Sequence, residues 1–387
     1  MEFIKTSKKV EDIRIPEGNV IKIEEAKTGR ILWEKGLYFE PVGKYSQYNR
    51  VPTAVFDDGS KLVFFISQIY DNNDIALNPS WFTYIPSSGK FSNLTTLTIP
   101  RIECIGMHPN NKKWIAFFSR GMETSAGIAR NLCKKDGTKF QWYDDNDFYD
   151  YLYRPNCCWV SHLNRFCIAD DATYKYELGS VLFDEDGYYT ERYLTNFSSY
   201  DYPLLYNNNL KQKNAICYSL KLKKILLMSP FVDGKTCKVR ILTSTDGLKW
   251  SFNSNNPPLI SSTFFDNLLW LEDLNIFIAL TASDKNIYQS IDGITWTLKS
   301  TAPAKFLTCA WSPTKKVFCG ITCDYSYDYS NATYITKDFV HWSKVGIHGL
   351  TGKLISGYGS YLIWSNTANA FILTGKEKDA LFYKLDI

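Results

Sequence analysis

The sequence predicts an all-β protein: a seven-bladed β-propeller of four-stranded antiparallel blades, preceded by a short N-terminal β-hairpin segment. Three observations lead to this fold class. Aromatic residues make up 16% of the 387 residues, and Tyr, Phe and Trp favour strands over helices. One spaced apolar pattern recurs seven times, and a short turn signature follows several of its copies.

The recurring pattern is a large apolar residue followed seven positions later by a second apolar residue, with mostly polar or turn residues between them. The position after the second member is apolar in every copy. The first members are 41 to 59 residues apart, a length that suits one four-stranded blade. The pairs are Phe56 and Val63, Met107 and Trp114, Trp159 and Phe166, Tyr218 and Ile225, Trp270 and Phe277, Trp311 and Phe318, and Trp364 and Phe371.

Each copy is typical of a β-hairpin. In the sixth copy, residues 306–311 form an apolar run, residues 312–316 (SPTKK) supply the turn, and residues 317–321 form the returning run. Short strand-forming runs joined by Pro, Asn, Asp or Lys predict hairpins. No long stretch has a clear apolar period of 3.6, so no substantial helix is expected. Each blade would hide its apolar faces only against its neighbours, so the set forms one cooperative domain.

A second signature follows three of the hairpins, at residues 244–250 (STDGLKW), 290–296 (SIDGITW) and, in a degenerate form, 336–342 (TKDFVHW). Weaker relatives occur at 135–137 and 184–187. The signature resembles the Asp-box (BNR repeat) of sialidase-like propellers. That resemblance implies a tight turn between the third and fourth strands of a blade, with Asp and Ser bonded to backbone N–H groups and Trp buried between blades. In that family the box lies away from the active site, so it indicates fold and not catalysis.

The predicted ring closes through both ends of the chain. The seventh repeat offers three strands, at 360–365, 370–375 and 380–385. An unpaired edge there would invite aggregation. Residues 37–42 (LYFEPV) share the alternation of the outer-strand stretches 250–253 and 296–299. We therefore expect 37–42 to pair with 380–385, so that residues 37–387 form the propeller domain.

Residues 1–36 precede all the repeats and are predicted to form a separate attachment segment. Residues 20–24 and 30–34 are strand-like, with a turn at 27–29. The run from Ile15 to Gly36 is similar to short modules of bacteriophage tail and other virion proteins. That similarity implies an element that docks a display domain onto a particle. A hairpin of this length is not stable alone in water, so it must pack on the propeller, on a partner or on other copies.

No catalytic residue is predicted. Ile13-Arg14-Ile15-Pro16 resembles the arginine-bearing motif of sialidases but precedes the first blade, whereas the family's motif lies on an inner strand. Other propeller glycosidases use paired carboxylates at a central funnel. Most of the candidate acids fall at predicted turns or strand ends, where Asp is a common turn residue; they are Asp57, Asp58, Asp170, Asp171, Glu272 and Asp273.

No metal or cofactor site is predicted either. The chain has ten Cys and four His but no CxxC pair and no HxxxH pair, so a zinc site is not expected. Cys158 and Cys217 directly precede a pattern residue, and Cys167 and Cys319 occupy a position that is apolar in every other copy. These cysteines are expected to be small core residues with free thiols, made in a reducing compartment.

Charge and hydropathy exclude other partners. The formal net charge is +4 and is spread along the chain, which argues against nucleic acid or an anionic membrane as a partner. No apolar run has the length of a membrane span, and the first residues lack the apolar core of a secretory signal. Synthesis and assembly in a cytoplasm are expected.

Three Tyr-rich stretches, 143–153, 188–206 and 325–334, suit loops that bind carbohydrate or protein, or insertions packed on one another. The leading hypothesis is a non-enzymatic bacteriophage virion protein, oligomeric in the particle. It would bind other virion proteins through residues 1–36, and it would serve either as a tail or fibre protein whose propeller contacts host surface glycan or protein, or as a structural spacer. The alternatives are a glycoside hydrolase or lyase acting on host polysaccharide, and an intracellular protein-interaction scaffold.

Overall fold

The structure is a computed structural model. It describes residues 23–24, 31–33, 37–44, 52, 54–66, 69–70, 76–77, 80–96, 101–108, 114–119, 128–133, 140–144, 155–170, 178–185, 189–195, 216–233, 236–253, 259–260, 267–281, 284–322, 333–347, 361–374 and 380–387. The described residues are all-β, without a helix. Accordingly, they include no helix that is long and apolar enough to cross a membrane.

Four sheets have four strands each, in simple sequential order. They are β11 (Arg101–Met107), β12 (Trp114–Ser119), β13 (Ile128–Cys133) and β14 (Phe140–Asp144); β15 (Pro155–Val160), β16 (Arg165–Asp170), β17 (Leu178–Phe183) and β18 (Tyr189–Thr195); β19 (Ile216–Ser219), β20 (Lys224–Asp233), β21 (Thr236–Ser244) and β22 (Leu259–Ile260); and β23 (Asn267–Leu271), β24 (Ile276–Leu280), β25 (Asn286–Ser290) and β26 (Thr297–Thr301).

The other sheets are less regular. A five-stranded sheet contains β4 (Ala54–Asp57), β5 (Leu62–Ile66) and β8 (Ser80–Ile85), with β9 (Lys90–Phe91) and β10 (Thr95–Thr96) both paired to β8. An eight-stranded sheet has the order β27 (Phe306–Ser312), β28 (Val317–Thr322), β29 (Thr333–Thr336), β30 (Ser343–Ile347), β3 (Tyr38–Val42), β33 (Phe382–Asp386), β32 (Ala370–Thr374) and β31 (Tyr361–Ser365). Two small hairpins are β1 (Ile23–Glu24) with β2 (Ile31–Trp33), and β6 (Ile69–Tyr70) with β7 (Ala76–Leu77).

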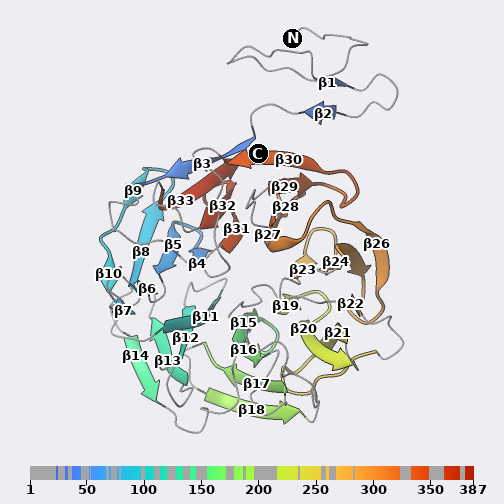
Figure 1. Cartoon of the computed structure of the whole chain (residues 1–387). Coiled ribbons are helices and arrows are strands. Elements are labelled where there is room, and N and C mark those ends of the chain that lie inside the picture. The colour runs from blue at the N-terminus through green and yellow to red at the C-terminus, as the bar shows by residue number, and fades with distance from the viewer. Residues whose placement is uncertain are drawn as a thin grey trace.

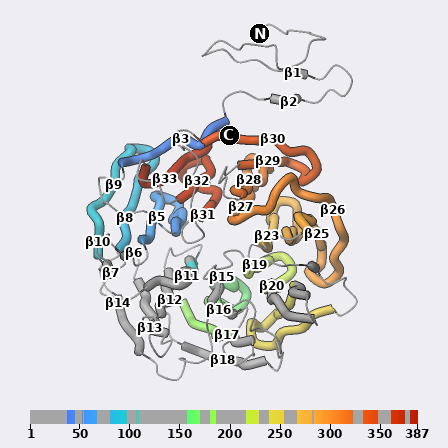
Figure 2. The backbone as a smooth tube through the Cα atoms, viewed as in Figure 1, coloured from blue at the N-terminus to red at the C-terminus, as the bar shows by residue number. Residues whose placement is uncertain are grey.

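The larger sheets are arranged around a common centre, with the first strand of each repeat nearest to it (Figure 1). Successive inner strands lie side by side, from β11 through β15, β19, β23, β27 and β31 to β4. The smooth backbone trace follows the same circuit and returns β31–β33 beside β4 and β5 (Figure 2). From the sheet β15–β18 round to the sheet that begins with β4, each pair of neighbouring sheets shares a cluster of buried apolar side chains.

The seven-residue spacing of the sequence pattern corresponds to a cross-strand pair close to the turn of the first hairpin of each repeat, and in six repeats one further pair lies between it and the turn. Trp159 lies opposite Phe166, and Trp311 lies opposite Phe318. The other five pattern pairs are cross-strand neighbours in the same way. In five of these turns the residue just before the second strand has a positive φ, a conformation that Asn adopts more readily than most side chains. Those residues are Asn164, Lys223, Asn275, Lys316 and Asn369.

In the repeats whose side chains the structure describes, the second strand lies in the core. Every residue of β5, β28 and β32 is buried. Both faces of these strands pack against neighbouring sheets, so they are continuous apolar runs without polar alternation. Between the first and last sheets, the Phe64 ring stacks on Phe82 and Phe382 at centroid distances of 4.9 and 4.5 Å.

Two departures from the regular pattern were not anticipated. The β20–β21 hairpin has strands of 10 and 9 residues and is longer than its counterparts in the neighbouring sheets. In the first sheet the outer edge is divided into β9 and β10, where the Ser92 hydroxyl accepts the Thr83 N–H in place of a backbone carbonyl.

Candidate functional site

The ring has two faces that carry different connections. Within an antiparallel sheet, the turn from the first to the second strand and the turn from the third to the fourth strand lie at the same end. His162, in a first turn, contacts the Thr245 carbonyl of the next sheet's second turn at 2.7 Å. We call this end of the ring the turn face. The opposite end, the connection face, carries the links from second to third strands and from each sheet to the next.

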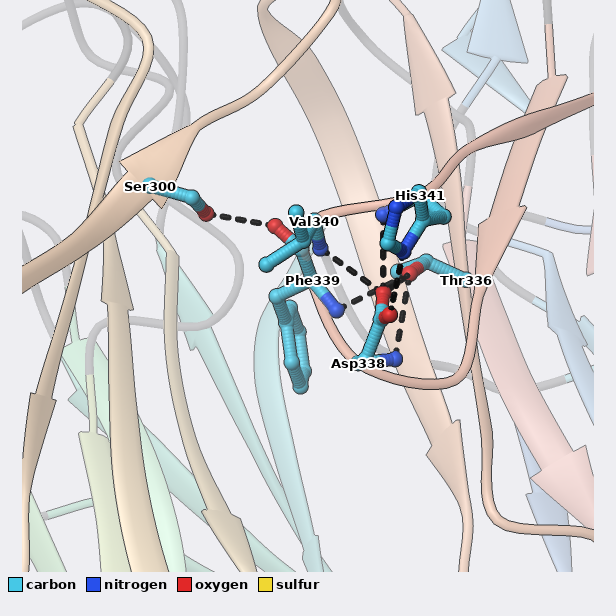
Figure 3. A network of polar contacts seen from close by, with 6 residues as sticks. All are labelled: Ser300, Thr336, Asp338, Phe339, Val340 and His341. Atoms are coloured by element: carbon cyan, nitrogen blue, oxygen red, sulfur yellow. Dashed lines mark hydrogen bonds and ion pairs between the residues drawn. The ribbon is translucent and has the colours of Figure 1, made fainter. Parts of the chain in front are cut away.

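Three turns on the turn face share one hydrogen-bond network, and we call residues 244–250, 290–296 and 336–342 the S/T-x-D turns. Figure 3 shows the third of them. The Thr336 hydroxyl donates to Asp338 at 3.1 Å and accepts the N–H of Phe339 at 2.9 Å. Asp338 also accepts the backbone N–H groups of Val340 and His341, both at 2.8 Å. Ser244 with Asp246 and Ser290 with Asp292 repeat this arrangement.

The third turn differs from the other two at the position that needs a positive φ. Gly247 and Gly293 have φ values of 74° and 73°, which glycine adopts without strain. Phe339 has φ 63° at the same place. Its ring is 1% exposed and lies 5.2 Å from Phe318 and 6.0 Å from Trp311, centroid to centroid. Burial of a large aromatic ring offsets the backbone strain.

The carboxyl groups of these turns are held in the ionised form. Desolvation raises the pKa of Asp246, Asp292 and Asp338, but the donated hydrogen bonds outweigh it, and each pKa lies below its usual value. For Asp338 the largest lowering contribution is the hydrogen bond from the His341 side chain. A carboxylate that accepts several N–H bonds stabilises a turn and is a poor proton donor near neutral pH.

The S/T-x-D turns also join neighbouring sheets. The Trp250 indole N–H donates to the Ser180 hydroxyl at 3.1 Å. Lys224 Nζ donates to the Asp292 carbonyl at 2.8 Å. Between the next two sheets, Ser300 donates to the Phe339 carbonyl at 2.5 Å (Figure 3). These contacts give the turns a structural role.

Asp57 forms a clasp between the first sheet and the last. Its carboxylate accepts the Ser365 hydroxyl and the Thr367 N–H, both at 2.8 Å, the Thr367 hydroxyl at 2.5 Å, and the Gly59 N–H at 2.8 Å. Burial opposes ionisation, but these donors lower the pKa of Asp57 below its usual value. A carboxylate with four donors is positioned to hold two sheets together.

The remaining candidate acids do not converge on one site. Asp58 accepts N–H groups from its own turn. Glu272 accepts the Trp270 indole N–H, and Asp273 accepts the Trp311 indole N–H at 2.6 Å. Asp170 is the last residue of β16, at the connection face. The other four described acids lie at the turn face, Asp57 as the last residue of β4 and the rest in first turns. Asp171 lies outside the described residues.

His162 is a contact residue that the sequence pattern did not reveal. Its ring stacks on Tyr218 of the next sheet with an interplanar angle of 15°. The Tyr218 hydroxyl lies 3.0 Å from His162 Nδ1, and burial raises the pKa of that phenol. Another inter-sheet ring contact joins His108 to Trp159, with centroids 3.8 Å apart and the rings tilted by 41°. The one sequence signal that could have suggested these contacts is that each His lies shortly after a pattern residue, in the repeat that precedes the repeat of its aromatic partner.

The strand β3 joins the N-terminal segment to the ring. On one side it pairs antiparallel with β33, where Glu40 lies opposite Lys384 and Val42 opposite Phe382. On the other side it pairs parallel with β30, where Tyr38 lies opposite Gly346. The parallel pairing was not anticipated.

Side chains fix β3 in this position. Phe39 is fully buried in a cluster with Cys319, Ile321, Val345 and Leu385. A Cβ at Gly346 would lie 2.2 Å from the Tyr38 ring, so a larger residue there would displace that ring.

The described cysteines fit the expected core role. Six of them, Cys157, Cys158, Cys167, Cys217, Cys309 and Cys319, form no disulfide. Desolvation raises the pKa of Cys167 to about 12 and raises that of Cys158, Cys217 and Cys319 as well. Within the part of the chain that the structure describes, no group of three His, Cys, Asp or Glu side chains could hold a metal ion.

Several expectations concern residues outside the described ranges. They include Arg14, most of residues 1–36, and the central parts of the Tyr-rich stretches. For the N-terminal hairpin the structure describes β1 and β2, which pair antiparallel with Ile23 opposite Trp33. The undescribed segments 145–154, 196–215 and 323–332 connect β14 to β15, β18 to β19 and β28 to β29, so the strand ends that flank them lie at the connection face.

Comparisons with known proteins place the fold. No family model matches the chain, and no curated protein matches it. Among solved structures it is similar to the Cps50 (Swd1) β-propeller domain of Myceliophteria thermophila, with a TM-score of 0.54 and 12% identity over 87% of this chain and 97% of that one. A candidate 6-phosphogluconolactonase of Bacteroides uniformis has a TM-score of 0.49 and 11% identity over 84% of this chain and 95% of that one. The first of these likenesses and the ring of sheets show that the chain has a β-propeller fold.

Proposed function

We propose that this protein is a non-enzymatic structural component of a bacteriophage particle, a propeller displayed through residues 1–36. The observation that carries the proposal is the position of β3. The strand that follows the N-terminal segment is inserted between β30 and β33. A segment joined to the ring through this strand can tether the propeller to a partner.

The propeller of this proposal has seven blades. Five blades are the sheets that begin with β4, β11, β15, β19 and β23, and the sixth is β27–β30. The seventh consists of β31–β33 with β3 as its outer strand. The three S/T-x-D turns support the Asp-box resemblance, because their Ser or Thr, Asp and Trp side chains bond or pack as that resemblance implies.

The connection face is the proposed binding face. The strands β14, β18 and β28, which precede the undescribed parts of the three Tyr-rich stretches, end there. Tyr presents a flat apolar ring and a hydroxyl, a combination suited to sugars. We therefore propose that host surface glycan binds at this face, while residues 1–36 contact other virion proteins.

A non-enzymatic role is favoured by the carboxylates. Asp57, Asp58, Glu272 and Asp273 each accept hydrogen bonds within turns or between sheets. We expect no sialidase turnover by the purified protein. Hydrolysis of a fluorogenic sialoside that a single arginine substitution abolishes would instead support the glycoside hydrolase alternative.

Particle incorporation tests the attachment proposal. A phage lacking this gene would be complemented with the full chain or with a chain lacking residues 1–35. The full chain should be recovered in purified particles, and the truncated chain should remain soluble, folded and absent from them. Equal recovery of both chains would contradict attachment through this segment.

A further inference from the structure

The strand β3 has hydrogen-bonded neighbours at both of its edges. Tyr38 and Phe39 pair with β30, and residues from Glu40 to Val42 pair with β33. Backbone bonds extend the contact beyond the strand, from Gly346 N–H to the Leu37 carbonyl at 3.3 Å and from Leu381 N–H to the Val42 carbonyl at 3.2 Å. The strand is therefore held along its whole length.

The direction of β3 follows from its parallel neighbour. β30 begins directly after the S/T-x-D turn at 336–342, so it starts at the turn face. β3 is parallel to β30, and the chain therefore enters β3 from the turn-face end. A pull on residues 1–36 from that side acts along the strand axis.

We propose that β3 is a shear clamp that holds the propeller on its N-terminal tether under mechanical load. When the ring is held at its connection face and the tether is pulled, the bonds to β30 and β33 are strained together. By contrast, a force that pulls two paired strands apart from one end breaks the hydrogen bonds between them one after another. The biological use of the clamp rests on the proposed attachment through residues 1–36.

Two side chains oppose sliding of the strand. Phe39 is fully buried, and sliding would withdraw it from its apolar cluster. The Tyr38 ring occupies the space over Gly346. Displacement of β3 along its axis would move that ring off the space that Gly346 leaves.

The same strand is weak in another direction. Glu40 lies opposite Lys384 in an antiparallel pair, which places the start of β3 beside the end of β33. Force applied between the N-terminus and Ile387 therefore peels the two strands apart from that end. The clamp predicts strong resistance in one geometry and weak resistance in the other.

Single-molecule force spectroscopy of the full chain tests this prediction. One handle is placed at residue 1 in both cases. The second is placed either at Ile387 or, through a bio-orthogonal side chain, at exposed Pro303 in the link from β26 to β27 on the connection face. The first rupture force should be about twofold higher, or more, with the handle at Pro303, because the bonds must break together. Equal forces in the two geometries would overturn the clamp.

A substitution on β30 tests whether that strand contributes. Gly346→Ala should lower the rupture force in the Pro303 geometry, because a Cβ there displaces Tyr38. Lys344→Ala, on the same strand at an exposed position, is the control and should leave that force unchanged. If Gly346→Ala prevents folding, Tyr38→Ala replaces it and should have the same effect. Unchanged force in the folded variant would contradict a contribution from β30. The measurement uses purified protein, so its failure would leave the particle-incorporation test of the proposed function unaffected.

Discussion

The sheet formed by β23–β26 and the seam around β3 achieve the same packing in different ways. In the first, one continuous segment supplies all four strands, and Trp296 follows an S/T-x-D turn to pack between sheets with 6% exposure. At the seam, β3 lies more than 340 residues before its partner β33, and no S/T-x-D turn precedes it. The register places Phe39 opposite Ile347 of β30, and its side chain is fully buried in a cluster that also contains Leu385 of β33.

The comparison shows that the ring requires the outer-strand position of each sheet to be filled and packed. The strand that fills it need not be continuous with the other strands of that sheet. The Phe339 carbonyl accepts a bond from Ser300 of the preceding sheet's outer strand. At the seam the Leu37 carbonyl accepts one from Gly346 of the corresponding strand. An aromatic side chain follows each contact within a few residues. The N-terminal strand thus replaces the turn and the tryptophan that other sheets take from their own repeat.

Removal of the seam strand should have the largest effect. Deletion of residues 1–43 exposes β33, the edge of β30 and the cluster around Phe39, so the whole ring should lose stability. Deletion of residues 1–35 leaves β3 intact and should not change the melting temperature measured by calorimetry. If both truncated chains melt with the full chain, β3 does not close the ring.

Truncation of the seam aromatic should have the next largest effect. Phe39→Ala should lower the free energy of unfolding by about 3–5 kcal/mol, the usual cost of emptying a buried aromatic site. Trp296→Ala is the matched change in a regular sheet and should cost a similar amount. Urea denaturation followed by circular dichroism measures both. A loss below about 1 kcal/mol for Phe39→Ala alone would show that the two positions are not equivalent.

The clasp on the other side of the same seam should contribute less. Asp57→Asn removes the charge that four donors share, and a loss of about 1–3 kcal/mol is expected. Asp58→Asn is the control, because Asp58 bonds only within its own turn. Equal losses in the two variants would show that Asp57 does not join the sheets.

The clasp also predicts a pH dependence. The pKa of Asp57 is lower in the folded protein than in the unfolded chain, so its contribution is fully present above the unfolded pKa. That contribution is lost as the pH falls through the lower, folded value. The difference in stability between the native chain and Asp57→Asn should therefore shrink on acidification below pH 4. A difference that stays constant down to pH 2 would contradict this assignment.

The smallest effect is expected at an S/T-x-D turn of the regular region. Asp338→Asn keeps an oxygen for the Val340 and His341 N–H groups but loses the charge next to the His341 ring. Because this turn is exposed, a loss of about 1 kcal/mol or less is expected from denaturation curves. A loss of unfolding free energy as large as that of Phe39→Ala would contradict the expectation that the seam contributes more to stability than this turn does.

The local features of the fold could be predicted from the sequence. The spacing between Trp159 and Phe166, for example, corresponds to a cross-strand pair beside the turn of a hairpin, because turn length fixes register. The apolar second strands and the turns with Asp and Gly can each be recognised from a few consecutive residues of the sequence. These signals depend only on neighbours along the chain.

Contacts between distant segments were less accessible. The parallel pairing of β3 with β30 left no periodic signal, since parallel register is set by the ring geometry. The clasp between Asp57 and Thr367 was also missed. Asp is common at turns, so its place beside a predicted turn gave no reason to expect a contact with another sheet. The stack of His162 on Tyr218 depends on the distance between two sheets, which no single repeat encodes.

Hydrogen exchange of the intact protein tests the central claim most directly. Backbone amides within residues 37–43 should be protected about as strongly as those of β26, and both should exchange only when the ring opens. Mass spectrometry of peptides covering 37–43 and 297–301 makes the comparison. Similar protection of the two peptides is the predicted result. Exchange of 37–43 at the rate of an unfolded chain, with 297–301 still protected, would contradict the account of β3 as the strand that closes the ring.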